Sequence, residues 1–251
     1  MRRLFPVSLL ALATLSTAWA QPTGVAALQE LLAGGYYALA AQVEGPQAVK
    51  AQPQNAEARL LYARALYFVG NLGAARAQLA RAEPLAATPA LKRSLTHLDA
   101  LVRAAEGDTE RATRLLAQVF KAAPDYDIAM DWGQVAWQGG DLETALRAYR
   151  EAAGTSKGKT EPWPSLNYAR VLLQQGQFRA AMAPLETTLT ILEQDPNPRP
   201  SPAYAEAFYR LGQAHEAMNE IQEAVSNYQA AFSTDPTYAP AGDALRRLEN
   251  P

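Results

Sequence analysis

The stretch AFYRLGQAHEAMNEIQEAVSNYQAAFSTDP, residues 207–236, predicts two helices joined by a short turn at Asn219. Apolar residues recur every three or four positions on both sides of this turn, as they do in helices that bury one face. Gly212, Ala224 and Ala231 lie on these apolar faces and are small. Small residues allow two helices to approach closely, so that larger neighbours interdigitate around them. The stretch therefore predicts a tightly packed helical hairpin.

Turns of the same kind recur along the chain. They lie at Gly35, Gly70, Gly107, Gly140, Gly176 and Asn219, with spacings of 35, 37, 33, 36 and 43 residues. Glycine and asparagine tolerate the left-handed backbone that ends one helix before the next begins. Five positions after each turn residue comes an alanine: Ala40, Ala75, Ala112, Ala145, Ala181 and Ala224. We see no alternation typical of strands, so the pattern predicts an all-α chain of about six hairpins. These hairpins must stack, because none can bury its apolar face alone.

The residues around the turns resemble the tetratricopeptide repeat, whose signature places Leu-Gly, Tyr, Ala, Phe and a closing Pro at fixed spacings. The sixth repeat fits closely, with Phe208, Leu211, Gly212, His215, Ala224, Tyr228, Ala231 and Pro236. The fourth fits well, with Trp132, Gly133, Gly140, Leu142, Ala145, Tyr149 and Ala152. The first and third repeats depart most from the signature, since Asp99-Ala100 stands in place of Leu-Gly in the third.

This resemblance implies a right-handed superhelical solenoid over residues 21–251. Its repeats are expected at roughly residues 22–53, 55–88, 89–124, 126–157, 162–195 and 203–236, followed by a capping helix at 238–249. Leu245 and Leu248 of that helix should face inward, and Arg246 and Arg247 outward. The alternating prolines at 196, 198, 200 and 202 predict an extended excursion between the fifth and sixth repeats.

The first twenty residues, MRRLFPVSLLALATLSTAWA, have the three parts of a secretory signal peptide. Arg2 and Arg3 precede a short apolar run, and Ala18-Trp19-Ala20 supplies the small residues of a cleavage site. We therefore expect cleavage before Gln21 and export to the periplasm, the cell envelope or the exterior. An uncleaved anchor is the alternative. A general secretory signal is favoured over a twin-arginine signal, because Pro6 interrupts the latter pattern.

Composition and motifs argue against most catalytic sites. The 251 residues carry a net charge of −2 and no cysteine, so no broad cationic surface for nucleic acid and no thiolate site is expected. His97 and His215 lie three repeats apart and cannot share a metal. The stretch AGTSKGKT, residues 153–160, loosely matches a phosphate-binding loop, but a helical sequence precedes it and Pro162 and Pro164 follow. We expect an ordinary loop there, no cofactor, no metal and no enzyme activity.

In the family that the chain resembles, the first helices of the hairpins line a concave groove that takes a peptide or a helix of a partner. Residues 2, 3, 6, 10 and 13 positions before each turn residue share one helical stripe, which we expect to face that groove. The stripe is rich in aromatic and arginine side chains, which are typical interface anchors. The predicted partner-binding residues are Arg64, Tyr67, Phe68, Met130, Gln134, Trp137, Trp163, Arg170, Tyr209 and Gln213. Trp137 and Trp163 should lie together beside Arg170, unless they pack between repeats instead.

The sequence thus favours an exported, bacterial-type member of this family. We expect a non-catalytic scaffold that binds another protein within an envelope or secretion assembly, with no nucleic-acid partner and no stable membrane insertion after cleavage. Two alternatives remain open. One is a cell-wall or glycan binder, because aromatic faces and amide side chains also suit sugars, and the other is an enzyme or enzyme subunit. The sequence does not indicate the partner, the pathway or the oligomeric state.

Overall fold

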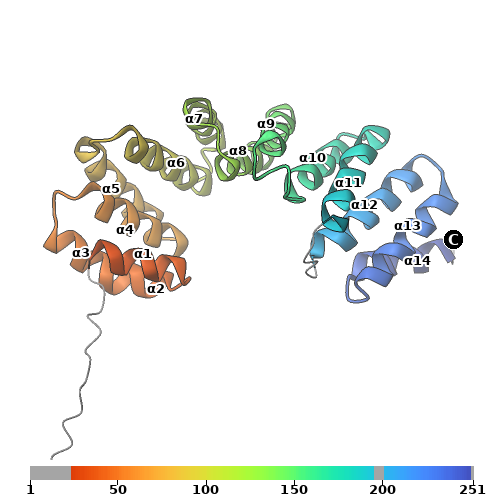
Figure 1. The fold of residues 1–251 in the computed structure, drawn as a ribbon, viewed down its shortest axis with the longest axis horizontal. Coiled ribbons are helices and arrows are strands. Elements are labelled where there is room, and N and C mark those ends of the chain that lie inside the picture. Colours follow the sequence, from red (N-terminus) through yellow and green to blue (C-terminus); the bar gives the residue numbers. More distant parts are fainter. Residues whose placement is uncertain (1–23, 195–200, 250–251) are drawn as a thin grey trace, which may run out of the picture.

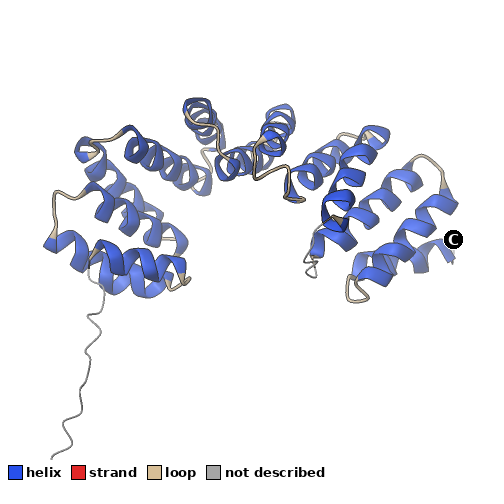
Figure 2. Cartoon of the chain, in the orientation of Figure 1, coloured by secondary structure: helices blue, strands red, loops and turns tan. Residues whose placement is uncertain are grey.

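The computed structural model describes residues 24–194 and 201–249, which form an arch of antiparallel helices (Figures 1 and 2). No strand occurs among these residues. The predicted signal peptide and most of the proline-rich excursion lie outside the described residues. Within the described part of the chain, no helix is long and apolar enough to cross a membrane.

The helices pair into six successive hairpins followed by one terminal helix. The predicted fold class, an all-α solenoid of stacked helical hairpins with a terminal helix, is confirmed. The first hairpin joins α1 (Val25–Ala33) to a broken second half, made of α2 (Tyr37–Leu39), the π-helix η1 (Ala40–Glu44) and α3 (Gly45–Ala51). The others are α4 (Ala56–Phe68) with α5 (Leu72–Ala82), α6 (Pro89–Ala105) with α7 (Thr109–Ala122), α8 (Tyr126–Gln138) with α9 (Leu142–Gly154), α10 (Trp163–Gln174) with α11 (Phe178–Glu193), and α12 (Pro202–Ala217) with α13 (Ile221–Thr234). A short 3₁₀ turn, η2 (Glu83–Leu85), follows α5, and the chain ends with α14 (Ala239–Glu249).

The turns within the hairpins have a common construction. Each of the six turn residues has a positive φ, from 62° at Asn219 to 94° at Gly107. In three hairpins the next residue caps the second helix: the side chains of Asn71, Asp108 and Asp141 each accept a hydrogen bond from a backbone N–H of the first turn. A left-handed residue followed by an Asn or Asp cap ends one helix and starts the next within two residues.

Aromatic rings of the second helices pack against small residues of the first helices. A Cβ atom on Gly212 would lie 2.5 Å from the ring of Tyr228, and one on Gly133 would lie 2.6 Å from the ring of Tyr149. Both tyrosine side chains are fully buried or nearly so. Gly212 thus faces Tyr228, one turn beyond the equally buried Ala224. The glycines make room for the largest side chains of the core.

The first hairpin differs from the regular pair of helices that the turn spacing predicts. Its second half contains a π-turn just before Pro46, which occupies the first turn of α3. Proline has no N–H to donate, and its ring clashes with the carbonyl four residues earlier in a regular helix, so a wider turn relieves the conflict. The neighbouring Gly45 packs so closely on α4 that a Cβ there would lie 2.2 Å from Tyr62.

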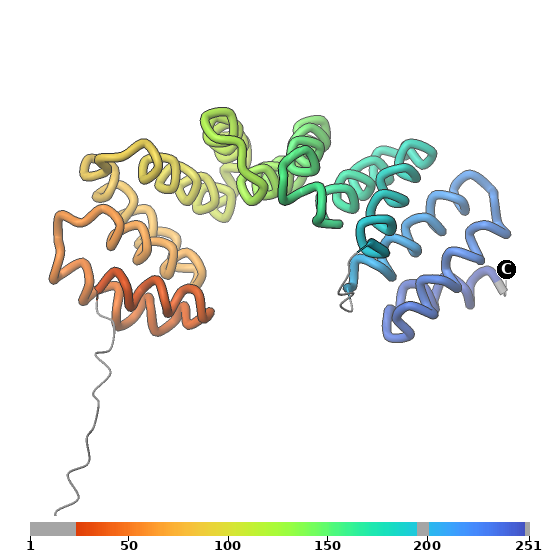
Figure 3. The backbone as a smooth tube through the Cα atoms, viewed as in Figure 1, coloured from red at the N-terminus to blue at the C-terminus, as the bar shows by residue number. Residues whose placement is uncertain are grey.

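The hairpins follow one another along a curve, with α1 to α3 at one end and α14 at the other (Figures 1 and 3). Near the middle, α8 lies on the inner side of the arch, whereas α7 and α9 lie on its outer side (Figure 1). At the middle of the arch a first helix therefore lies on the inner face, where the binding residues were expected.

Candidate functional site

The inner face of the C-terminal half holds a cavity of about 640 Å³, which we name the C-terminal cavity. Three first helices, α8, α10 and α12, supply most of its walls, and α11, α13 and α14 complete its edges. Four predicted partner-binding residues line it: Trp137, Arg170, Tyr209 and Gln213. The other lining residues are Leu173, Gln174, Phe178, Arg210, Glu216, Ala217, Tyr228 and Arg247.

Trp137 and Arg170 form the contact between α8 and α10 at one side of this cavity. The guanidinium carbon of Arg170 lies 5.2 Å from the centre of the Trp137 ring, a cation–π distance. The indole N–H of Trp137 donates to Oε1 of Gln174 at 2.5 Å, and Arg170 donates to Oδ1 of Asn167 at 3.1 Å. Both side chains are therefore held in place before any ligand arrives, which reduces the entropy lost on binding.

Glu206 on α12 connects two arginines of the C-terminal cavity. Its Oε1 lies 3.3 Å from Nε of Arg170 and 3.1 Å from Nη2 of Arg210. Arg210 also donates to Oε1 of Gln213 at 2.9 Å, and Gln213 donates to the hydroxyl of Tyr209 at 3.1 Å. A single carboxylate thus orients two guanidinium groups, and a chain of hydrogen bonds continues to the aromatic wall.

The opposite wall depends on the terminal helix α14. Arg247 reaches back to α12 and donates to both carboxylate oxygens of Glu216, at 2.5 and 2.8 Å, while the Tyr228 hydroxyl donates to the same carboxylate at 2.7 Å. The bond to Arg247 lowers the pKa of Glu216, although partial burial opposes this. Burial, followed by the contact with Glu216, raises the pKa of Tyr228. Arg247 is exposed, as expected, and it also joins the cap to the sixth hairpin.

A second cavity of about 440 Å³ lies on the inner face of the N-terminal half, between α1, α2, α4 and α6. Two predicted binding residues, Arg64 and Phe68, line it together with His97. Phe68 stacks on Tyr37, with ring centres 4.2 Å apart, yet remains 49% exposed. This N-terminal cavity is mostly apolar, in contrast to the arginine-rich C-terminal cavity.

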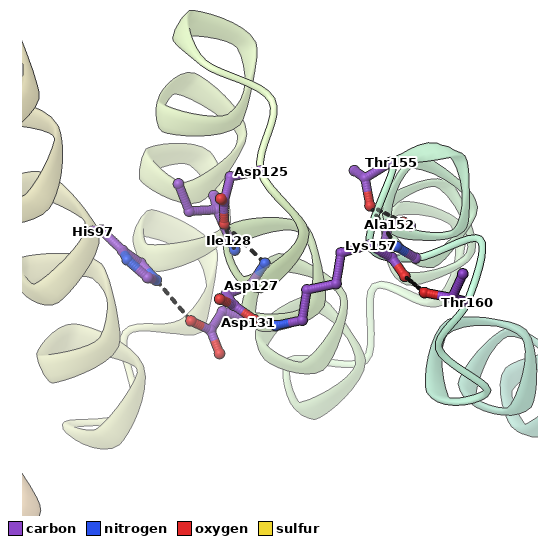
Figure 4. A network of polar contacts seen from close by, with 10 residues as sticks. His97, Asp125, Asp127, Ile128, Asp131, Ala152, Thr155, Lys157 and Thr160 are labelled. Carbon is purple, nitrogen blue, oxygen red and sulfur yellow. Dashed lines mark hydrogen bonds and ion pairs between the residues drawn. The ribbon is translucent and has the colours of Figure 1, made fainter. Parts of the chain in front are cut away.

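Polar contacts join α8 to α6 and to the connection after α9 (Figure 4). Nε2 of His97 on α6 lies 2.7 Å from Oδ2 of Asp131 on α8, so this pair joins the first helices of adjacent hairpins. On the other side of α8, Nζ of Lys157 lies 2.8 Å from Oδ1 of Asp127 and 4.3 Å from the ring centre of Tyr126. Figure 4 shows His97 reaching α8 from one side and Lys157, from the connection after α9, reaching it from the other.

The AGTSKGKT stretch lies in the connection that supplies Lys157. Helix α9 runs into it and ends at Gly154, and α10 begins only at Trp163. The amide of Gly158 donates to Oγ1 of Thr155, and a Cβ on Gly158 would lie 1.8 Å from the Ala152 carbonyl oxygen. No strand precedes the loop and no helix starts at Lys159, so the backbone does not form a phosphate cradle.

The four remaining predicted residues line neither inner cavity. Tyr67 packs against the N-terminal core, and burial together with the charge of Asp131 raises the pKa of its hydroxyl. Met130 packs between two core clusters, and Gln134 accepts a long hydrogen bond, 3.5 Å, from the Tyr149 hydroxyl. Tyr67 and Met130 are thus partly buried against clusters that span more than one hairpin, as the alternative interpretation of the stripe allowed. Gln134, by contrast, is exposed and contacts Tyr149 of its own hairpin.

Trp163 requires a correction. It was expected to lie beside Trp137 and Arg170, but it packs against the core cluster formed by α10, α11 and α12. The physical reason is its position as the first residue of α10, about 10 Å along the helix axis from Arg170. Two residues of one stripe lie on the same face of a helix, but they can still lie far apart along the helix axis.

Several side chains that line the C-terminal cavity were not among the predicted binding residues. Arg210 lies one position beyond a stripe residue, and Arg247 lies on the terminal helix, to which the repeat offsets do not extend. Tyr228 was assigned only to the core of the sixth repeat, although its hydroxyl reaches the cavity wall. The four-residue spacing between Glu206 and Arg210 on α12, which allows an ion pair on one helix face, was a signal that could have been used.

Comparisons with known proteins agree with this architecture. Tetratricopeptide repeat models match residues 97–159 and 205–238, so the chain contains tetratricopeptide repeats in these segments. Pseudomonas aeruginosa pilF is similar to it in structure, with a TM-score of 0.65 and 12% identity over 89% of this chain and 95% of that chain. BtubC (BKLC) from P. vanneervenii has a TM-score of 0.63 and 17% identity, covering 83% of this chain and 91% of that one.

A third solved structure is YrrB, described as a TPR protein with an unusual peptide-binding site. It has a TM-score of 0.61 and 18% identity over 80% of this chain and 97% of its own. At these identities the similarity shows a shared fold. No curated protein sequence matches the chain.

Proposed function

We propose that the protein is a non-catalytic scaffold that holds a segment of a partner protein in the C-terminal cavity. The observation that carries the proposal is the Trp137–Arg170 pair, fixed in an open cavity built by the first helices of three hairpins. Aromatic and arginine side chains in a pocket are the usual anchors of protein interfaces. The peptide-binding site described for YrrB, which has the same fold, supports the proposal by analogy.

The lining residues suit an extended peptide or one face of a helix. An apolar side chain of the partner would lie against Trp137 and Tyr209, with the amide groups of Gln174 and Gln213 near its polar atoms. The cavity volume, about 640 Å³, is within the range of concave sites that bury most of a small ligand. It therefore accommodates a few side chains of a partner segment rather than a folded domain.

Site-specific photo-crosslinking tests this proposal. A photoreactive residue at Ala217, an exposed position on the cavity wall, should form a discrete protein adduct in native envelope extract. The same residue at Gln229, exposed on α13 and outside the cavity, should not form that adduct. Equal adducts at both positions would contradict the choice of surface. Retention on purified cell wall, with no protein adduct at Ala217, would favour glycan binding instead.

We also propose that the scaffold acts outside the cytoplasm, because residues 1–20 have the basic, apolar and small-residue parts of a secretory signal. N-terminal sequencing of the protein from native envelope fractions should give a mature chain that begins at Gln21. Recovery of the chain with Met1 intact in the cytosol would contradict export.

A further inference from the structure

The C-terminal cavity has one more positive charge than its own carboxylates balance. Three arginines, Arg170, Arg210 and Arg247, meet two glutamates, Glu206 and Glu216, which leaves 3 − 2 = +1. Arg247 and Glu216 form a two-point pair and neutralise each other. The excess therefore belongs to Arg170 and Arg210, which share the single carboxylate of Glu206. This local excess is notable because the whole chain carries a net charge of −2.

The two arginines remain reachable from the cavity. The side chain of Arg170 is 34% exposed and that of Arg210 is 27% exposed, whereas Glu206 between them is 17% exposed. A guanidinium group has five N–H donors, so one carboxylate cannot use all the donors of two such groups. Partial burial also reduces solvent screening compared with a fully exposed arginine. A carboxylate of the partner could accept hydrogen bonds from the N–H groups of Arg170 and Arg210 that Glu206 does not use.

We infer that the partner segment in this cavity is acidic and that an Asp or Glu side chain beside an apolar residue pairs with Arg170 and Arg210. This inference rests on the proposed function and specifies the chemistry of the ligand. The apolar residue would lie against Trp137, which lines the cavity and also contacts the Arg170 guanidinium. Charge-assisted hydrogen bonds to two fixed guanidinium groups then select a carboxylate over the amide of the same shape.

A selection experiment can identify the preferred chemistry without a known partner. A library of random twelve-residue peptides, displayed with linkers at both ends so that no free carboxyl terminus is present, is selected on the immobilised protein. We expect Asp or Glu to be enriched beside an aromatic or aliphatic residue. The enrichment should disappear when the same library is selected on the Arg170→Gln/Arg210→Gln variant. Enrichment of neutral sequences on the unmodified protein would overturn the inference.

Matched peptides then measure the contribution of the carboxylate. The best peptide and its Glu→Gln or Asp→Asn counterpart are compared by fluorescence polarisation, and the acidic form should bind the unmodified protein about tenfold more tightly. The Arg170→Gln/Arg210→Gln variant should not discriminate between the two. Arg114→Gln, which removes the same charge from the exposed side of α7, should discriminate as well as the unmodified protein. If all three proteins prefer the acidic peptide to its amide counterpart equally, the inference would also be overturned, because the preference would not depend on Arg170 and Arg210.

Two outcomes separate this inference from the proposed function. If neutral peptides are selected and their binding is lost in Trp137→Ala, the cavity binds peptides but is not selective for acid, so only the inference fails. If no peptide depends on Trp137, or if none is selected, both fail. A second library, displayed with free C-termini, tests whether the carboxylate comes from the chain terminus. If only peptides with a free C-terminal carboxylate bind, the ligand group is not an Asp or Glu side chain, and the inference is contradicted.

Discussion

Replacing Trp137 with alanine is expected to weaken capture of the partner or of a selected peptide about thirtyfold or more. Trp137 forms one wall of the C-terminal cavity and supports the Arg170 guanidinium 5.2 Å from its ring centre. Truncation of a well-packed interface anchor costs on the order of 2 kcal/mol or more, which is about thirtyfold in affinity. The variant loses the apolar contact and also releases Arg170 from its fixed position, so both effects act in the same direction.

The same substitution should change folding only slightly. Trp137 is half-buried and packs on the edge of a core cluster, whereas the fully buried members of that cluster are Ala136, Ala145, Tyr149 and Val171. We expect an unchanged circular dichroism spectrum and a small decrease in melting temperature. If Trp137→Ala unfolds, the ring is a core residue and the binding surface must be sought elsewhere.

Trp163→Ala is the matched control, because it truncates the same residue type one hairpin away. Trp163 packs against the core of α10, α11 and α12 and does not line the cavity, so its loss should lower the melting temperature and leave capture intact. Both tryptophans are partly buried against a core cluster, so the two variants should differ mainly in binding. If Trp137→Ala is folded and still captures the same ligands with unchanged affinity, the proposed binding site is wrong.

The solenoid itself was predictable because its signals are local. A glycine or asparagine at each turn, an alanine five residues later and apolar residues at helical spacing each constrain only one hairpin. Repetition then determines the global arrangement, since each hairpin contacts mainly its neighbours. The π-turn before Pro46 was missed because the turn spacing predicts a regular second helix, and the proline that interrupts that helix was not used as a signal.

The candidate site was predictable only in part, for a related reason. The stripe of inner-face residues placed Trp137, Arg170, Tyr209 and Gln213 in one cavity, because helical periodicity fixes the face on which a side chain lies. Periodicity does not determine which residues of two adjacent helices lie side by side along the helix axes, and this is why Trp163 was misplaced. The charge pattern depends on Glu206 bridging two helices and on Arg247 returning from α14, and neither contact has a sequence spacing of its own.

Replacing Gly212 with leucine is expected to destabilise the sixth hairpin by about 3 kcal/mol, near the upper end of the usual cost of overpacking. Even a Cβ atom at this position would lie 2.5 Å from the Tyr228 ring, closer than real Cβ contacts allow. Leucine has a higher helix propensity than glycine, by somewhat less than ~1 kcal/mol, so the steric cost must exceed that gain. Because Tyr228 is 1% exposed, its ring cannot move aside without separating α12 from α13.

Thermal melting should show this as a decrease of about 6–12 °C, from roughly 2–4 °C per kcal/mol in a chain of this size. Gln229→Leu, which adds a similar apolar side chain at an exposed position of α13, is the control and should leave the melting temperature nearly unchanged. Similar small effects of the two substitutions would mean that the buried face of the hairpin is assigned incorrectly.

The damage should also be local, because a solenoid transmits instability mainly to adjacent units. Displacing Tyr228 removes the hydroxyl that donates to Glu216, and Glu216 is the residue through which Arg247 holds α14. Hydrogen exchange in Gly212→Leu should therefore accelerate in α12, α13 and α14 together, while α4 to α9 keep their protection. Since the C-terminal cavity is built partly on these three helices, peptide binding should weaken in parallel with this exchange. Uniform acceleration along the whole chain would instead indicate that the hairpins unfold as one cooperative unit.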